Sequence, residues 1–258
     1  MLRGGVANAG AVVREGSFVL RPASEHTEYI HALLRHVRAA GFDGVPEPVG
    51  IDPDGHERLV FIPGDVPLPP YPPWSRTDSA VASIARLLSR FHEAARTFQP
   101  PRGAGWSPEL ADPEGGGVVC HNDVCLENVV FRDGIAIALL DFDFAAPGRT
   151  LYDLAAMARM CVPLESPEDA RTWGTEPFDP FVRLRLVADS YGLPPGREDL
   201  VAIVEQSMID GGEFVRRRVM RGDPAFVEMW NRMGGEARFD RRHDWFAEHR
   251  GEFIEAIG

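Results

Sequence analysis

The sequence predicts an α+β protein with two unequal lobes, a small β-rich N-terminal lobe and a large, mainly helical C-terminal lobe. Three observations predict this fold class. Short β-type runs surround a single amphipathic helix before residue 62. The next segment, residues 63–74, is too rich in proline for a helix or a central strand, and most of the chain after it has the apolar spacing of helices. The expected lobes are therefore residues 1–64 and residues 65–258.

The N-terminal lobe is expected to combine four short strands with one helix. The helix, residues 27–40, has apolar side chains at helical spacing and ends before Gly41. Turn residues separate the strands of each pair, Glu15-Gly16 in the first pair and the DPDG of residues 52–55 in the second. The expected strands are residues 11–13, 17–20, 45–51 and 58–62.

The C-terminal lobe is expected to hold one hairpin among its helices. Residues 75–98 have the pattern of a long amphipathic helix. Apolar runs at residues 129–131 and 135–140 flank the turn residues Asp133-Gly134 and predict a hairpin. The remaining expected helices are residues 151–160, 178–191, 197–221, 224–233 and 241–257.

Composition limits the classes of function. The chain carries a net charge of −12, and all 27 of its basic residues are arginines. This acidic balance argues against a nucleic-acid partner and weakly favours a cationic small-molecule substrate. No apolar run is long enough for a membrane helix, the N-terminus lacks the apolar core of a secretory signal, and the three cysteines form no zinc or disulfide pattern. We therefore expect a cytoplasmic protein with no membrane partner.

The stretch VVCHNDVCLENVVFRDGIAIALLDFDF, residues 118–144, places acidic and amide side chains at the ends of apolar runs. Because an unpaired buried carboxylate is costly, these side chains need a compensating charge. The predicted hairpin brings Asn128 beside Asp141, and an amide oxygen together with a carboxylate suits Mg²⁺. Asp123, at the start of the preceding loop, can lie beside this metal and accept a hydrogen bond from a hydroxyl. Phosphoryl transfer requires little more.

The order of these motifs resembles the aminoglycoside phosphotransferase and choline kinase-like group of small-molecule kinases, which have the protein-kinase-like fold. Members carry HGD-x-x-x-x-N, an apolar strand that ends in D-[FW]-[DE], and then D-L-A. The counterparts here are HND at residues 121–123, Asn128, DFD at residues 141–143 and DLA at residues 153–155. GGVAN at residues 4–8 resembles the group's degenerate glycine-rich start, and FIPG at residues 61–64 resembles its lobe linker.

The resemblance implies a small-molecule phosphotransferase. Asp123 would be the catalytic base or would orient the acceptor hydroxyl. Asn128 and Asp141 would bind Mg²⁺, with Asp143 as a secondary metal contact. The γ-phosphate of ATP or GTP would pass to a hydroxyl of an aminoglycoside-type amine or of another metabolite, which would bind in the C-terminal catalytic lobe.

The same resemblance implies supporting and nucleotide-binding residues. His121 would brace the catalytic loop, and Asp153 would be a structural partner of the site. Backbone groups of Phe61 and Ile62 would meet the purine ring, so that residues 1–64 would form a nucleotide-binding lobe with its linker.

Several positions depart from the group. Arg21, in the strand FVLRP, stands where these kinases place the lysine that contacts the α- and β-phosphates, and arginine keeps the charge but not the geometry of lysine. The acidic partner on the following helix is not evident, because Ile30 falls at the expected position and Glu25 and Glu28 are off register. Asn122 replaces the usual glycine. These departures motivate an alternative function, a pseudokinase-like nucleotide-binding regulatory module.

Two other interpretations use only part of the pattern. The run DFDF alone fits the D-x-D manganese motif of a nucleotide-sugar glycosyltransferase, but that function leaves Asp123 and Asn128 without a role. A metallohydrolase cluster would combine His121 with the three acidic residues, but too few histidines lie nearby in the sequence. The combined spacing favours the kinase.

Overall fold

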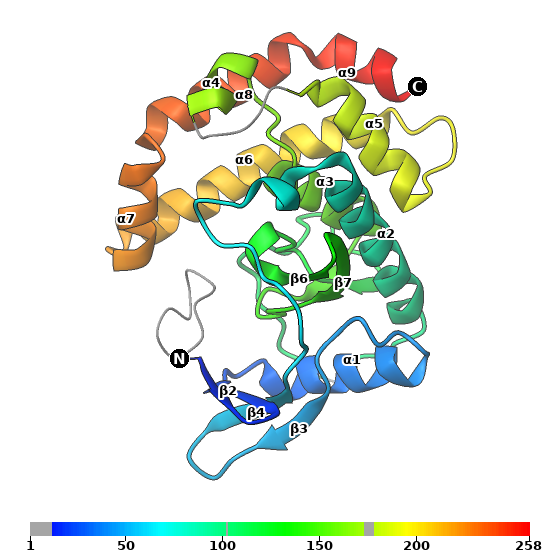
Figure 1. The fold of residues 1–258 in the computed structure, drawn as a ribbon, viewed down its shortest axis with the longest axis vertical. Coiled ribbons are helices and arrows are strands. Elements are labelled where there is room, and N and C mark those ends of the chain that lie inside the picture. The colour runs from blue at the N-terminus through cyan, green and yellow to red at the C-terminus, as the bar shows by residue number, and fades with distance from the viewer. Residues whose placement is uncertain (1–11, 102, 173–177) are drawn as a thin grey trace.

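The computed structural model describes residues 12–101, 103–172 and 178–258. Its small N-terminal part is a four-stranded antiparallel sheet in the order β1-β2-β4-β3, at the bottom of Figure 1. The elements are β1 (Val13–Glu15), β2 (Phe18–Pro22), α1 (Thr27–Ala39), β3 (Pro48–Ile51) and β4 (His56–Val60). The predicted helix is present, and three of the predicted strands overlap β2, β3 and β4. The first predicted strand, residues 11–13, shares only Val13 with β1, because Glu15 pairs with Phe18 and does not belong to the turn. The predicted glycine-rich start at residues 4–8 lies outside the described residues.

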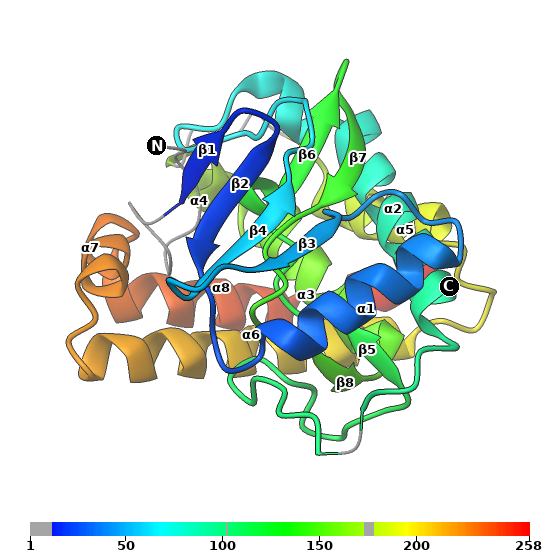
Figure 2. The same cartoon turned by 90° about the horizontal axis from the view of Figure 1, so that it is seen from below.

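The apolar face of α1 attaches this sheet to the rest of the molecule. Ile30, Leu33, Leu34 and Val37 recur at helical spacing, and all four are buried in the main core. The helix contacts both β3 and α2 (Asp78–Ala95), and Figure 2 shows it crossing beside the sheet. The position of β2 and β4 relative to the large lobe is therefore fixed by packing.

The proline-rich linker is anchored to the hairpin of the large lobe. Asp65 exchanges two backbone hydrogen bonds of 2.8 Å with Phe131. At Gly64 the two segments come so close that a Cβ atom would lie 2.4 Å from Val130 Cγ1 and 2.5 Å from the Phe131 carbonyl oxygen. Only glycine fits there. We propose that the lobe boundary lies at this contact, between residues 64 and 65.

The predicted hairpin forms in the middle of the molecule. Its strands are β6 (Val129–Arg132) and β7 (Ile135–Leu139), and Asp133 and Gly134 form the turn with φ angles of 52° and 74°. Helix α2 packs against β7, and Ala136 N–H donates to the buried Ser83 hydroxyl of α2 at 2.8 Å. A second strand pair joins β5 (Val118–Cys120) to β8 (Ala146–Gly148), and β5 contacts α2 and α3.

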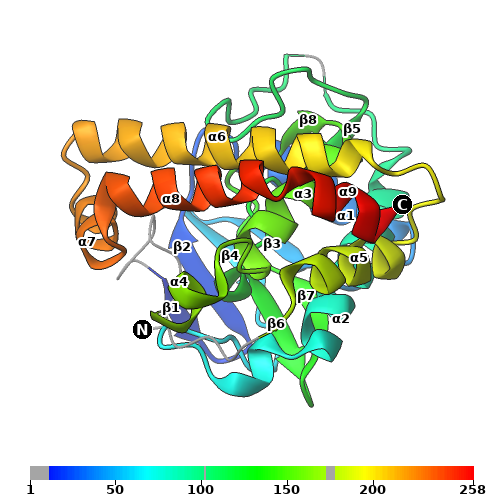
Figure 3. The ribbon, with the colours of Figure 1, turned by 90° about the horizontal axis from the view of Figure 1, so that it is seen from above.

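Helices make up the rest of the large part, and α6 and α8 lie side by side in Figure 3. They are α3 (Thr150–Cys161), α4 (Pro167–Thr172), α5 (Pro180–Tyr191), α6 (Asp199–Met220), α7 (Pro224–Arg232), α8 (Gly235–Glu248) and α9 (Arg250–Ile257). The prediction of one helix over residues 241–257 is wrong. The chain breaks at His249, which has φ −100° and ψ 12° between α8 and α9; its ring Nδ1 lies 2.7 Å from the Trp245 carbonyl oxygen. Among the described helices, none has the length and apolar character needed to cross a membrane.

Candidate active site

The hairpin joins the two predicted metal ligands. Asn128 ends the short 3₁₀ turn that leads into β6, and Asp141 follows β7. Leu140 N–H donates to the Asn128 carbonyl at 2.8 Å, which holds the two ends of the hairpin in register. Asp141 itself has a φ of 60°, a conformation that non-glycine residues seldom adopt outside special sites.

A single cleft contains four of the predicted site residues, Asp123, Asn128, Asp141 and Asp143. The Asn128 amide nitrogen donates to the Asp123 carbonyl oxygen at 2.9 Å and to its Oδ2 at 3.0 Å. This pair of bonds fixes the Asp123 carboxylate and turns the Asn128 amide oxygen away from it. The predicted hydroxyl-binding carboxylate and the predicted metal ligand are thus direct neighbours.

His121 connects the catalytic loop to the end of β7. It is fully buried, and burial lowers its pKa, so the ring is neutral near pH 7. Its Nε2 lies 2.8 Å from the Leu140 carbonyl and must donate there, because Nδ1 accepts the Asp123 N–H at 3.3 Å. One ring therefore sets the backbone position of Asp123 relative to the segment that carries Asp141.

Asp153 supports the same loop from α3. It is fully buried, and its two carboxylate oxygens accept the N–H groups of His121 at 2.7 Å and of Asn122 at 2.8 Å. Burial alone would raise the pKa of Asp153, but hydrogen bonds and the attraction of His92 lower it below the ordinary carboxyl value. His92 of α2 lies with its Nε2 2.9 Å from Oδ2 of Asp153. The other ring nitrogen, Nδ1, lies 2.7 Å from the Tyr191 hydroxyl of α5. The sequence gives no role to His92, because its partners lie 61 and 99 residues away.

Asn122 occupies a position where the backbone demands an unusual conformation. Its φ is 65°, in the left-handed region that glycine and asparagine tolerate best. The side-chain amide nitrogen also donates to the Phe144 carbonyl at 3.0 Å. Asparagine in place of the group's glycine therefore keeps the loop geometry.

Arg21 reaches from the small lobe into this site. Its three guanidinium nitrogens contact three different carboxylates: Nε meets Glu57, Nη1 meets Asp141 at 2.8 Å, and Nη2 meets Asp143 at 2.8 Å. Burial by itself would lower the pKa of Arg21, but these carboxylates raise it overall. The residue predicted to replace the lysine thus lies directly against two predicted metal-binding carboxylates.

The acidic partner of Arg21 comes from the sheet and not from the helix. Glu57 stands opposite Arg21 in the β2–β4 ladder and is buried, whereas Glu25 and Glu28 are exposed. Helix α1 contributes His31, whose Nε2 lies 2.7 Å from Glu57 Oε2. The sequence does not predict Glu57 as this partner, because nothing in it distinguishes Glu57 from any other acidic residue of a short strand.

The cleft concentrates negative charge. Burial raises the pKa of Asp123 to about 7, and repulsion from Asp141 adds to this effect, while Arg159 and the bond from Asn128 oppose it. Burial likewise raises the pKa of Asp141, against the attraction of Arg21. A raised carboxyl pKa next to a cleft is typical of functional sites.

The donor set fits a divalent cation. Asn128, Asp141 and Asp143 offer an amide oxygen and two carboxylates to one cleft, and oxygen donors are what Mg²⁺ prefers. Burial raises the pKa of Asp141 in spite of the attraction of Arg21, so a cation that joined the site would favour the ionised form of this carboxyl. These residues therefore fit the metal that the resemblance implies.

Phe61 and Ile62 lie on the linker and do not line this cleft. The Phe61 N–H already donates to the Ser17 carbonyl at 2.8 Å, and the Arg14 guanidinium covers its ring at 3.7 Å. The contact of the Phe61 and Ile62 backbone with a purine stays a prediction. The three free cysteines are buried, and burial raises the pKa of Cys125 well above that of an ordinary thiol, so it is no ready nucleophile.

Comparison with known proteins agrees with this geometry. Residues 104–198 match the phosphotransferase enzyme family. The trifolitoxin immunity protein of Rhizobium leguminosarum bv. trifolii is 32% identical over 187 residues, which cover 70% of each chain. A choline/ethanolamine kinase family protein from Mesorhizobium loti has a similar structure, with a TM-score of 0.63 and 16% identity over 99% of this chain and 90% of that one. An aminoglycoside phosphotransferase from Alicyclobacillus acidocaldarius subsp. acidocaldarius aligns with a TM-score of 0.52 and 14% identity, over 95% and 90% of the two chains.

The fold is the bilobal protein-kinase-like fold of these structural neighbours, and the predicted fold class is confirmed. The chain belongs to the phosphotransferase enzyme family. Its structural neighbours include an aminoglycoside phosphotransferase and a choline/ethanolamine kinase family protein.

Proposed function

We propose that the protein transfers the γ-phosphate of ATP or GTP to a hydroxyl of a small molecule. The observation that carries this proposal is the single cleft in which Asp123, Asn128 and Asp141 meet. Arg21, anchored by Glu57, supplies positive charge from the small lobe at the same place. Phosphoryl transfer depends mainly on such positioning and charge.

Each residue has a distinct task in this proposal. Asn128 holds Oδ2 of Asp123, so Oδ1 is the oxygen that would accept the proton of the acceptor hydroxyl. His121 and Asp153 hold the loop that carries Asp123. Asn128, Asp141 and Asp143 would hold Mg²⁺, which when bound neutralises phosphate charge.

The rival function is the nucleotide-binding regulatory module without catalysis. Two departures from the group suggested it: Arg21 in place of the usual lysine, and the absence of a glutamate at the expected position on the following helix. The contacts of Arg21 with Glu57 and Asp141 weaken both arguments for the regulatory module, because the cation has an acidic partner and reaches the carboxylates proposed to bind the metal. A fixed Asp123 with a pKa of about 7 also suits a general base better than an inert residue.

Calorimetry combined with one substitution tests the proposal. The wild-type protein should bind MgATP or MgGTP, and Asp123→Ala should retain nucleotide binding while it abolishes turnover. If neither nucleotide binds, the protein is not a kinase of this type. Full turnover in Asp123→Ala would exclude the assigned mechanism.

The similarity to the trifolitoxin immunity protein supports a second proposal, about biological context. The same phosphotransferase would serve in immunity to a toxin. Expression in a trifolitoxin-sensitive bacterium should then protect the cells, and Asp123→Ala should not. Equal protection by both variants would separate immunity from the phosphotransferase site.

A further inference from the structure

Arg159 is a cation in the cleft that the proposed reaction does not yet use. It lies in the last turns of α3 and lines the same cleft as Asp123. Its neighbours there are Met160 and, from α6, Gly211 and Phe214. Arg159 therefore lies on the helical side of the site, whereas Arg21 enters from the sheet.

The charge of Arg159 has no acidic partner in the part of the chain that the structure describes. Its Nε donates to the Ser207 hydroxyl at 3.1 Å, and its Nη1 lies 3.1 Å from the Met160 sulfur. No carboxylate of the described residues lies within ion-pair distance of it, although Arg21, Arg183 and Arg238 each have one. Burial lowers the pKa of Arg159 in spite of the attraction of Asp123. Arg159 is half-buried, and a partly desolvated cation without a partner would favour a ligand that supplies the anion.

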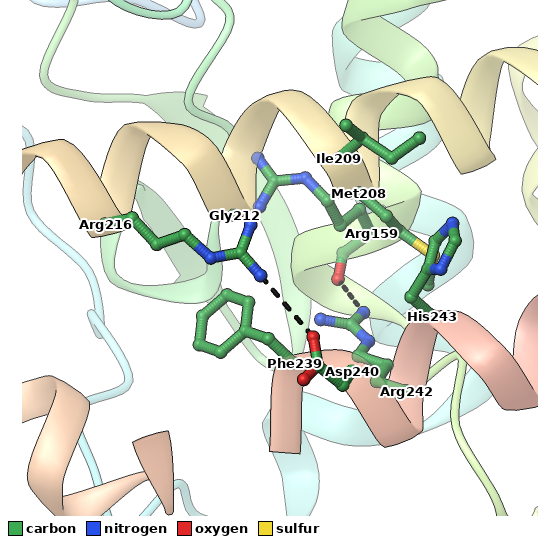
Figure 4. Close-up of a pocket in the computed structure, with 9 residues that line it drawn as sticks. All are labelled: Arg159, Met208, Ile209, Gly212, Arg216, Phe239, Asp240, Arg242 and His243. Atoms are coloured by element: carbon green, nitrogen blue, oxygen red, sulfur yellow. Dashed lines mark hydrogen bonds and ion pairs between the residues drawn. The ribbon is translucent and has the colours of Figure 1, made fainter. Parts of the chain in front are cut away.

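Helix α6 is shaped to admit this guanidinium. Gly211 and Gly212 stand together in the middle of α6, where glycine costs about 1 kcal/mol relative to alanine. A Cβ atom at Gly211 would lie 2.6 Å from both Cζ and Nη1 of Arg159. Figure 4 shows Arg159 extending from α3 to α6 at this point. The missing side chain is thus what allows Arg159 to reach the cleft.

The other arginines near Arg159 have protein partners. Figure 4 shows the neighbouring cavity, which Arg159 shares with Arg216 and Arg242. Arg216 pairs with Glu236, and Arg242 donates to the Arg159 carbonyl at 2.6 Å, near the end of α3. Neither of them lines the cleft with Asp123. Of these three arginines, Arg159 is the one that lines the cleft with Asp123.

The rest of this end of the cleft is apolar or already engaged. Phe144, Phe214 and Phe226 form a wall in which successive ring centroids lie 5.4 Å apart. Glu127, the remaining carboxylate on this side, is hydrogen-bonded to Tyr71, and burial raises its pKa. The local pattern is one cation beside an apolar surface, whereas the net charge of the whole chain favoured a cationic acceptor.

We infer that Arg159 binds an anionic group of the acceptor, so that the substrate is a hydroxylated carboxylic acid with an apolar body. This inference rests on the proposed phosphotransferase function and names its substrate class. A planar guanidinium can hold a carboxylate through two parallel hydrogen bonds, while the apolar body packs on the phenylalanine wall. The hydroxyl then lies toward Asp123.

The test uses hydroxyl compounds that share one apolar body and differ in the charge of their polar group. The probes are 3-phenyllactate, its neutral amide 3-phenyllactamide, and the cationic amino alcohol phenylalaninol, with matched sets that carry alkyl chains. Calorimetry measures their binding to the protein with and without a non-hydrolysable ATP or GTP analogue. In each set, the carboxylate should bind more tightly than the amide by roughly 10-fold or more.

Substitutions identify the residue responsible. Arg159→Gln should remove the preference for the carboxylate and leave amide binding unchanged, and Arg159→Lys should restore part of it. Arg216→Gln, in the neighbouring cavity, is the matched control and should keep the full preference. Thermal unfolding checks that each variant folds.

Several results would overturn the inference. The first is binding of the amide or the amine that is as tight as that of the carboxylate, or tighter. The second is an equal loss of affinity for all probes in Arg159→Gln, and the third is a carboxylate preference that survives in Arg159→Gln. Weaker binding of the nucleotide analogue in Arg159→Gln would instead assign Arg159 to the donor. Nucleotide binding is measured in the same experiment, so failure of the phosphotransferase proposal is distinguishable from failure of this one.

Discussion

Asp123 carries a charge that the folded protein accommodates poorly without a ligand. Burial raises its pKa from 3.8 to about 7, so the folded state binds this proton more tightly than the unfolded chain does. The resulting stabilisation is complete at low pH and is lost as the pH rises through about 7. Asp123→Asn removes this loss and preserves the shape of the side chain.

We therefore expect Asp123→Asn to be more stable than the wild type above pH 7, by on the order of 2 kcal/mol in free energy of unfolding. The difference should shrink toward zero as the pH approaches 4. Urea unfolding of both proteins at several pH values measures it. A difference that does not change with pH would show that the Asp123 pKa is not raised.

Prediction at the residue scale succeeded where the partners are local in sequence. Asn128 and Asp141 flank one hairpin, so their proximity followed from the turn at Asp133-Gly134. Glu57 and His92 were missed because each meets its partner only after the chain has folded, across 36 residues for Glu57 with Arg21 and 61 residues for His92 with Asp153. No local pattern marks such a pair.

At the scale of elements, α2 supports the catalytic loop through one contact. His92→Leu removes the hydrogen bond to Asp153 and leaves a buried carboxylate with one partner fewer. We expect a loss of roughly 1–3 kcal/mol in stability and a lower kcat, with the nucleotide Kd unchanged, because the residues proposed to bind Mg²⁺ lie elsewhere. Chemical unfolding and steady-state kinetics measure these quantities.

The control for this prediction is His36→Leu in α1. His36 bonds the Thr97 hydroxyl at 3.1 Å and has no contact with the loop, so stability and kcat should change little. Equal effects of the two substitutions would argue against a positioning role for His92.

Substitutions of Gly211 and Gly212 in α6 distinguish an effect on helix stability from an effect on ligand binding. Gly211→Ala should keep or increase stability, by up to about 1 kcal/mol, because alanine favours the helix. The new methyl group would displace the Arg159 guanidinium, so carboxylate probes should bind more weakly. Gly212→Ala is the control, since its Cβ would meet Arg216 at 3.3 Å and not Arg159. Unchanged carboxylate binding in Gly211→Ala would show that Arg159 does not need this opening.

Periodicity located the long elements and failed for the short ones. Helices such as α2 and α6 bury one face, and their apolar spacing predicts them. The strands β5 and β8 have three residues each and α4 has six, which is too short for a period to be visible. The break between α8 and α9 is a single residue, His249, outside helical geometry, and no apolar pattern indicates it.

At the scale of the whole molecule, Arg21 connects the two lobes. It joins β2 to Asp141 and Asp143 of the large lobe through separate nitrogens, and a lysine has only one nitrogen to offer. Arg21→Lys should therefore weaken nucleotide binding roughly 10-fold and lower stability by about 1–3 kcal/mol, although lysine is the residue usual in this group. Calorimetry and chemical unfolding measure the two effects.

Arg58→Lys is the matched control in the same sheet. Arg58 pairs with Asp52 near the surface at 3.0 Å, so its replacement should change neither quantity appreciably. A gain of nucleotide affinity in Arg21→Lys would mean that the native site is impaired, and it would revive the regulatory-module alternative.

The most direct test of the central claim follows the transferred phosphate itself. Wild type and Asp123→Asn are incubated with Mg²⁺ and γ-labelled ATP or GTP over a panel of hydroxyl acceptors, which includes hydroxy acids, amino alcohols and aminoglycosides. The wild type should label at least one acceptor, and Asp123→Asn should be slower by roughly 1,000-fold or more while it binds the nucleotide with similar affinity. Label transfer at the wild-type rate by Asp123→Asn would contradict the account.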